Sequence, residues 1–125
     1  MSSYIVLESL CDSIIKLNKN IQSVAVINNH GRVIEKISRP MFEKQFPDHL
    51  NELFCMGFAL QVSMGRDFDD KYGPIHYHIS ERENLIIITF PIDENIILVT
   101  ANKNISPIAF SRKTIPIIIE HIKRL

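Results

Sequence analysis

Three uninterrupted apolar runs constrain the fold of this chain more than any other feature. They are VAVI at residues 24–27, LIIITF at 85–90 and IILV at 96–99, and all three are rich in the β-branched residues that favour strands. A strand with one solvated face alternates apolar and polar residues, whereas an uninterrupted apolar run needs cover on both faces. The runs therefore predict inner strands of a sheet that carries helices on each side.

The links between the strands indicate how they pair. The segment NNHG at residues 28–31 supplies residue types that tolerate positive φ, so it predicts a hairpin turn between the first two strands. His30 within it has no evident carboxylate or second metal ligand and is expected to be a turn residue. Short polar links predict that the last three strands form an antiparallel meander. The expected strands are residues 22–28, 32–37, 75–80, 85–92 and 95–101.

Helices are expected at residues 3–18, at 48–65 with Asp48 as the N-cap, and from about 107 to the end of the sequence. The apolar pattern of the second helix comprises Leu50, Leu53, Phe54, Gly57, Phe58, Leu60 and Met64. Further apolar residues extend beyond that stripe, namely Cys55, Met56, Ala59 and Val62. A helix that is apolar nearly all round needs burial on more than one side, which a partner subunit can provide.

Other segments are less regular. Residues 38–47 predict an amphipathic turn through Phe42 and Phe46, and residues 66–74 predict a solvated polar loop whose acids do not follow the EF-hand order. In the last helix, Pro116 predicts a kink or a division in two, because proline cannot donate a backbone N–H. The stripe expected to be buried there is Ile108, Ile115, Ile118, Ile119 and Ile122.

The composition limits the class of protein. A chain of 125 residues with 46% hydrophobic residues has the size and content of one domain, expected to span 1–125. Equal numbers of basic and acidic residues give no overall field toward nucleic acid or anionic lipid, so neither is an expected partner. No signal peptide is evident, and no apolar stretch approaches the roughly 20 residues that span a bilayer. We expect a cytoplasmic protein without direct membrane insertion.

Motifs for chemistry are missing from the sequence. It contains no P-loop, no G-x-S-x-G and no H-E-x-x-H pattern, so no catalytic or cofactor-binding residue is named, and neither an enzyme nor a cofactor is expected. Cys11 and Cys55 are expected to be buried free thiols. His76 and His78 share one face of a strand, but a metal site needs a third ligand and none is evident. The favoured interpretation is that they are edge-strand histidines without a metal. A further hypothesis is that protonation of these histidines in acid weakens a dimer formed at this edge.

The expected order α-β-β-α-β-β-β-α gives an α+β fold, a five-stranded antiparallel sheet with helices on both faces. A chain with this order of elements resembles the roadblock/LC7 superfamily, in the profilin-like and longin-like group. The first hairpin of that family is similar to SVAVINNHGRVIEK, and its fourth and fifth strands are similar to LIIITFPIDENIILVTANKN. The resemblance covers residues 3–125, and the chain is also similar to short uncharacterised archaeal proteins. It departs from the family in the long segment SRPMFEKQFP and in Pro116.

The resemblance implies a non-enzymatic scaffold that dimerises through its second helix and the edge strand after it. Such dimers present a platform to small GTPases, motor subunits or membrane-tethered complexes, and homodimer and heterodimer both remain open. No arginine finger can be assigned, since Arg32, Arg39 and Arg66 are equally well explained as solvated side chains. Carried onto this sequence, the interface would comprise Met56, Gly57, Leu60, Gln61, Met64, His76, Tyr77 and His78.

A ligand-sensing domain is the alternative, because PAS-like and profilin-like sheets can hold a small molecule between sheet and helix. That alternative predicts a pocket lined by residues such as Phe54, Phe58 and Phe90. Core packing is the simpler interpretation of these rings, because the sequence shows no buried-looking polar groups to orient a ligand.

Overall fold

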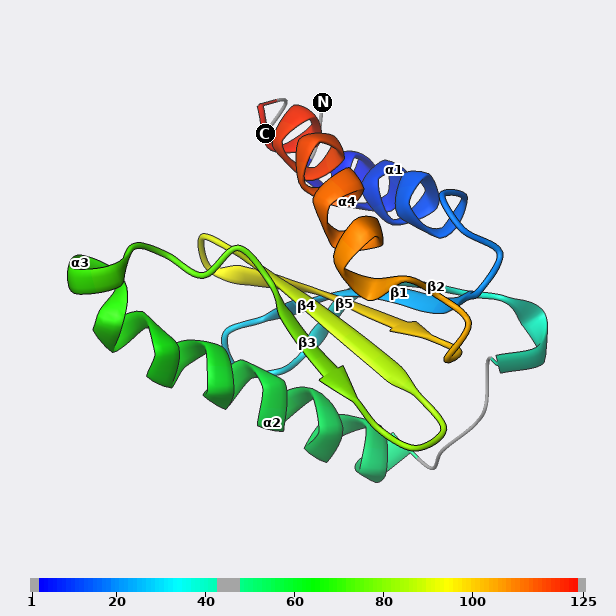
Figure 1. The fold of residues 1–125 in the computed structure, drawn as a ribbon, viewed down its shortest axis with the longest axis horizontal. Coiled ribbons are helices and arrows are strands. Elements are labelled where there is room, and N and C mark those ends of the chain that lie inside the picture. Colours follow the sequence, from blue (N-terminus) through cyan, green and yellow to red (C-terminus); the bar gives the residue numbers. More distant parts are fainter. Residues whose placement is uncertain (1–2, 43–47, 124–125) are drawn as a thin grey trace.

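A computed structural model of the chain describes residues 3–42 and 48–123. These residues form the expected α+β fold, an antiparallel five-stranded sheet in the order β2-β1-β5-β4-β3 with helices on both faces (Figure 1). The strands are β1 (Ile21–Asn28), β2 (Val33–Ser38), β3 (His78–Glu81), β4 (Ile86–Ile92) and β5 (Asn95–Ala101). The helices are α1 (Ser3–Ile15), η1 (Pro40–Phe42), α2 (Asp48–Gly65), η2 (Arg66–Phe68), α3 (Asp69–Tyr72) and α4 (Pro107–Ile122).

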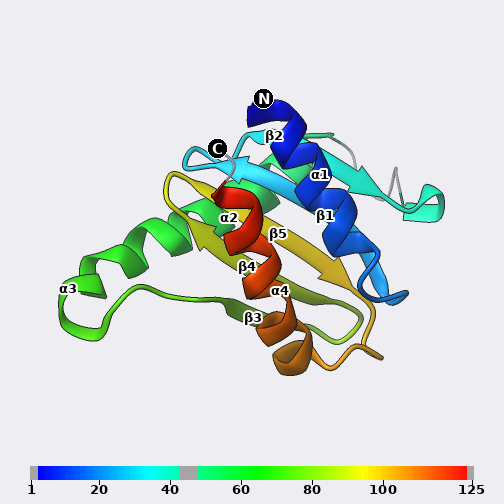
Figure 2. The same cartoon turned by 90° about the horizontal axis from the view of Figure 1, so that it is seen from above.

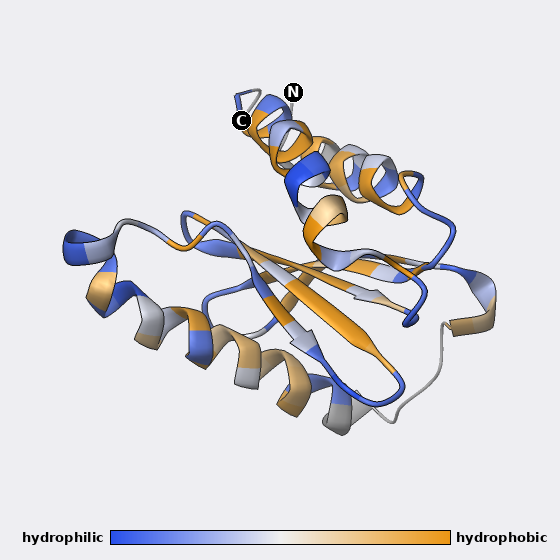
Figure 3. Ribbon diagram, in the orientation of Figure 1, coloured by the Kyte–Doolittle hydropathy of each residue, from blue (hydrophilic) through white to orange (hydrophobic). Residues whose placement is uncertain are grey.

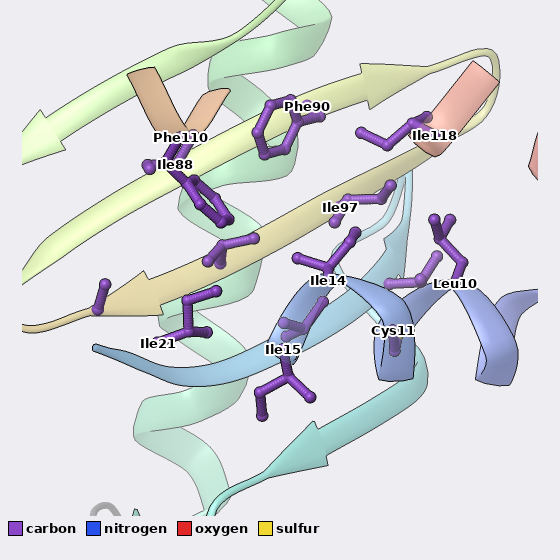
Figure 4. Packing of buried hydrophobic residues seen from close by; sticks show 14 of the residues in the cluster. Leu10, Cys11, Ile14, Ile15, Ile21, Ile88, Phe90, Ile97, Phe110 and Ile118 are labelled. Carbon is purple, nitrogen blue, oxygen red and sulfur yellow. The ribbon is translucent and has the colours of Figure 1, made fainter. Parts of the chain in front are cut away.

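The sheet separates two apolar layers of unequal size. Helices α1 and α4 lie side by side on one face, and α2 lies on the other (Figures 1 and 2). The larger layer joins α1 and α4 to the sheet through fully buried side chains such as Ile14, Ile97 and Phe90 (Figure 4). Residues 24–27 are all buried, at 0 to 6% exposure, so the prediction of cover on both faces is confirmed for this strand.

The hairpin turn after β1 is confirmed and also positions α2. Gly31 has φ +81°, its N–H donates to the Asn28 carbonyl, and the Asn28 side chain accepts the N–H groups of His30 and Arg32. A β-carbon on Gly31 would lie 2.7 Å from the Cα of Met56. The turn therefore needs glycine for its backbone angle and for its close approach to α2.

Helix α1 ends at Ile15, three residues before the predicted end, because another segment takes up the backbone carbonyls there. The guanidinium of Arg39 donates to the carbonyls of Ile15, Asn18 and Ile21 at 2.9, 3.1 and 2.7 Å. Arg39 is half-buried, so the expectation of a solvated side chain is wrong for this residue. Its contacts hold the end of α1 against the start of β1.

The predicted buried stripe of α4 is partly wrong. Ile108 and Ile119 are 52% and 49% exposed, and Pro116 lies inside a helix that continues through it undivided. Ser111 and Thr114 point inward instead. Their hydroxyls donate to the backbone carbonyls of Pro107 and Phe110, one turn earlier in the same helix. The buried residues of α4 are Phe110, Ser111, Thr114, Ile118 and His121.

Two segments around α2 also differ from expectation. Residues 66–72 are helical, as η2 and α3, where a loop was predicted, although their side chains are largely exposed as expected of a solvated segment. Strand β3 begins at His78 and not at residue 75. Phe42 is half-buried in η1, whereas Phe46 lies outside the described residues. Among the described residues, no helix is long and apolar enough to cross a membrane.

Candidate functional site

Large apolar side chains are exposed along α2 on the side away from the sheet. Leu53, Leu60 and Met64 are each 62% exposed, Met56 is 53% exposed, and Gly57 and Gln61 lie exposed among them. Hydrophobic residues recur along the coloured part of α2 (Figure 3). We call this surface the outer α2 face; it comprises Leu53, Met56, Gly57, Leu60, Gln61 and Met64.

The buried side of α2 consists of smaller side chains than the sequence pattern predicted. Cys55, Ala59 and Val62 are 3 to 6% exposed, and the partly buried rings of Phe54 and Phe58 flank them. They pack on sheet residues Ala25, Ile27, Ile87, Ile96 and Leu98. Leu53, Gly57, Leu60 and Met64 of the apolar pattern point outward. Small side chains let the helix lie close to the sheet, and the large ones stay more than half exposed.

The exposed apolar surface continues past the end of α2. Phe68 in η2 is 61% exposed and Tyr72 in α3 is 73% exposed, with the Lys71 ammonium 5.3 Å from the centre of the Tyr72 ring. Sequence reasoning missed both rings by assigning residues 66–74 to a polar loop. A signal was present: large side chains recur every four residues from Met56 through Met64 to Phe68 and Tyr72.

The histidine-containing edge is divided between the two faces of the sheet. Strand β3 is the last strand at one margin of the sheet, as expected of an interface edge (Figure 2). His76 is exposed and precedes the strand, while Tyr77 packs into the larger layer with its ring 6.4 Å from that of Phe90. His78 is half-buried and pairs with Thr89 on β4, whose neighbours Ile87 and Pro91 face α2. The structure thus brings His78 to the α2 side and places Tyr77 on the other.

His78 and Thr89 carry buried polar atoms without a hydrogen-bond partner. These are the Nε2 atom of His78 and the Oγ1 atom of Thr89, on residues directly opposite each other in the β3 and β4 ladder. A buried polar atom without a partner costs free energy, so these two atoms lower the stability of the layer beneath α2. Metal binding gains no support from them, because no cluster of three potential metal ligands occurs among residues 3–42 and 48–123.

Both cysteines are buried free thiols, as predicted. Burial, with a further contribution from the Glu35 carboxylate, raises the pKa of Cys11 to about 12. Burial also raises the pKa of Cys55, although the nearby Lys36 ammonium opposes this. A raised pKa makes a thiol a poor nucleophile near neutral pH, so neither cysteine has the environment of an activated one.

Arg32 and Arg66 do not identify an arginine finger. Arg32 is exposed beside the hairpin turn, and the exposed Arg66 donates to the Asp93 carbonyl.

The aromatic pocket of the ligand-sensing alternative is not formed. Phe54 and Phe58 stack edge-to-face at 5.0 Å in the layer beneath α2, whereas Phe90 lies in the larger layer on the opposite face of the sheet. The cavity beneath α2 that Phe54 lines has a volume of about 80 Å³. Pockets for drug-sized ligands are several times larger, roughly 300–1,000 Å³.

Comparison with known proteins places the chain in a family and identifies its fold. A family model described as "Family of unknown function (DUF6659)" matches residues 4–123. None of the curated proteins matches the sequence.

Among solved structures, MglB of Myxococcus xanthus has a TM-score of 0.75 at 13% identity, covering 99% of this chain and 90% of MglB. A roadblock/LC7 domain from Streptomyces avermitilis has a TM-score of 0.69 at 10% identity, covering 91% and 92%. Profilin IA of Acanthamoeba castellanii has a TM-score of 0.58 at 11% identity, covering 92% and 94%. The roadblock/LC7 and profilin-like resemblance is therefore confirmed for the fold.

Proposed function

Since the chain belongs to this family of unknown function, its role has to be argued from its surface, and we propose that it is a non-enzymatic interaction module. In this proposal two subunits associate through the outer α2 face and the β3 edge, and the dimer presents a platform to a further protein. The observation that carries the proposal is the row of large apolar side chains on α2 that are 53 to 62% exposed. Exposed apolar surface of this kind marks protein interaction sites.

The two parts of the proposed interface complement each other physically. The outer α2 face provides flexible methionine and leucine side chains, which adapt to an opposing helix. The β3 edge provides backbone groups that can pair with a second strand and that otherwise promote aggregation. A two-fold axis near both features would extend the sheet across the dimer and pack one α2 against the other. His76 and His78 would lie near this junction, whereas Tyr77 would contribute from the opposite face of the sheet.

Two further considerations support the proposal. Proteins that share this fold include an MglB structure described as having a tetrameric arrangement, so the fold is compatible with self-association. The resemblance to roadblock/LC7 domains implies a small GTPase or a larger complex as the class of partner. We favour a platform role over catalysis because the described residues offer no activated thiol and no cluster of metal ligands.

Light scattering on a sizing column tests the self-association directly. Loaded over a hundred-fold range of concentration, the protein is expected to show a molar mass twice the 14.4 kDa of the monomer. A monomer at every concentration would refute the homodimer. Co-expression with candidate roadblock-type chains from the same genome would then test whether a different subunit covers α2.

A further inference from the structure

The margin of the sheet opposite β3 is formed by β2, which within residues 3–42 and 48–123 pairs only with β1 (Figure 2). None of the interface residues proposed above belongs to this strand. The backbone N–H of Lys36 donates to the carboxylate of its neighbour Glu35 at 3.1 Å. A side chain that occupies a strand N–H in this way is typical of an edge without a partner strand. The β2 edge is therefore open to pairing with another extended segment.

The two faces of the β2 edge carry opposite charge. Glu35 is opposite Val26 in the β1 ladder and lies close enough to Cys11 of α1 to raise the pKa of that thiol. Lys36 is opposite Ala25 and lies close enough to Cys55 of α2 to lower the pKa of that thiol. Glu35 and Lys36 thus point to opposite faces, the acidic side chain to the α1 side and the basic one to the α2 side. The alternation ends at Glu35, because a bulge at Ile34 precedes it in the ladder with β1.

Neighbouring side chains extend each charge along the edge. On the α2 side, Arg32 and His30 line the same groove as Lys36, with Glu52 as its one acidic residue. Val33, which is 50% exposed, provides an apolar centre for this groove.

On the α1 side, Glu8 and Asp12 line a groove together with Glu35, and Lys36 also lines it. Lys16 pairs with Asp12 at 2.8 Å, so the carboxylates of Glu8 and Glu35 outnumber the Lys36 ammonium among the remaining charges of this groove.

We infer that the β2 edge binds an extended segment of a partner protein in which acidic and basic residues alternate. Side chains of a strand alternate between its two faces, so such a segment directs its acidic residues to Arg32 and Lys36 and its basic residues to Glu8 and Glu35. Backbone pairing to β2 supplies affinity, and the charge alternation supplies register. An apolar residue among the acidic positions would contact Val33.

A second copy of β2 fits the same edge poorly in two of its registers. Antiparallel self-pairing centred on Lys36 places two lysines opposite each other, and pairing centred on Glu35 places two glutamates opposite each other. Like charges directly opposite in a ladder are destabilising. A strand of complementary charge pattern avoids this repulsion and is therefore the occupant we infer.

Two peptides of identical composition provide the test. In TEKLKET the acidic residues and the leucine share one face and the lysines share the other, whereas TEELKKT mixes the charges on both faces. We expect TEKLKET to bind roughly 2- to 30-fold more tightly than TEELKKT in fluorescence anisotropy, because two cross-strand charge pairs are lost in the second peptide. Amide shifts in ¹⁵N-labelled protein are expected to cluster at residues 33–38.

Protein variants and a modified peptide separate edge pairing from general attraction. The double variant Arg32→Glu with Lys36→Glu alters exposed side chains only and is expected to weaken TEKLKET binding about tenfold, while Lys113→Glu on α4 leaves it unchanged. N-methylation of two adjacent central residues of the peptide removes backbone donors and is expected to abolish binding.

Equal binding of the two peptides, binding that survives N-methylation, or shifts confined to α2 or β3 would each overturn the inference. Because β2 lies at the opposite margin from β3, a monomeric protein can still give the expected result, so this proposal and the dimer fail independently.

Discussion

Replacing Leu60 with glutamate tests the proposed interface at its centre. Leu60 lies in the middle of the outer α2 face and is 62% exposed, so the monomer core does not depend on it. Full burial of a leucine contributes about 1.5–3 kcal/mol, so burying its exposed part on association contributes about 1–2 kcal/mol per subunit. A two-fold dimer contains the residue twice, which gives about 2–4 kcal/mol in all. The dissociation constant is expected to rise by about 30- to 700-fold.

Sedimentation or light scattering across a dilution series measures this change, and urea denaturation checks that the subunit remains folded. Ile119→Glu is the matched control, because Ile119 is 49% exposed on α4, on the opposite side of the sheet from α2. It makes the same chemical change on a helix outside the proposed interface and is expected to leave the dissociation constant unchanged. If Leu60→Glu associates as strongly as the unaltered protein, or if both variants weaken association equally, the outer α2 face is not the interface.

Three further outcomes follow from the buried contacts. Arg39→Met removes three charge-assisted hydrogen bonds at a half-buried site and is expected to lower the free energy of unfolding by about 2–4 kcal/mol in urea; a loss below about 0.5 kcal/mol would show that these bonds contribute nothing net. Gly31→Ala is expected to destabilise more than Gly73→Ala, because both glycines have φ +81° but only Gly31 has neighbours within 4 Å of an added β-carbon; equal losses would refute the close approach to Met56. Burial raises the pKa of Cys11 from 9.0 to about 12 in the folded protein, so Cys11 favours folding below pH 9 and loses that contribution as the pH rises toward 12. The free energy of unfolding is therefore expected to fall between pH 9 and pH 12, and to fall less in Cys11→Ala.

The strands were predictable because an uninterrupted apolar run indicates a covered strand even when its neighbours are assigned wrongly. Residues 24–27 read as a doubly covered strand whichever neighbour covers them, and NNHG permits few conformations other than a turn. The start of β3 was less predictable: His76 and Tyr77 alternate in polarity like strand residues, yet the ladder with β4 begins only at His78. Alternation identifies the faces of a strand, but pairing determines its ends.

The orientation of α2 could not be predicted, and the physical reason is its composition. When apolar residues occur all round a helix, periodicity no longer distinguishes the side that meets the sheet. Here the sheet contacts Cys55, Ala59 and Val62, and size rather than hydrophobicity separates them from Leu60 and Met64.

In α4, polar residues are buried instead. Ser111 and Thr114 pack inward because their hydroxyls form hydrogen bonds to backbone carbonyls of the same helix. Phe54 and Phe90 lie on opposite faces of the sheet, which could not be predicted without knowing how the strands pair.

The two margins of the sheet differ in a way that links the two proposals. Association through α2 and β3 would leave a β2 edge at each outer end of the dimer, so one dimer would hold two extended segments of a partner. Two linked copies of TEKLKET should then bind the dimer roughly 10²-fold or more tightly than one copy, provided that the linker spans both ends. In Leu60→Glu this gain is expected to disappear at concentrations where the variant is monomeric, while the affinity of the single peptide stays the same. A linked peptide that binds the monomeric variant as tightly as the dimer would show that its gain does not arise from two β2 edges.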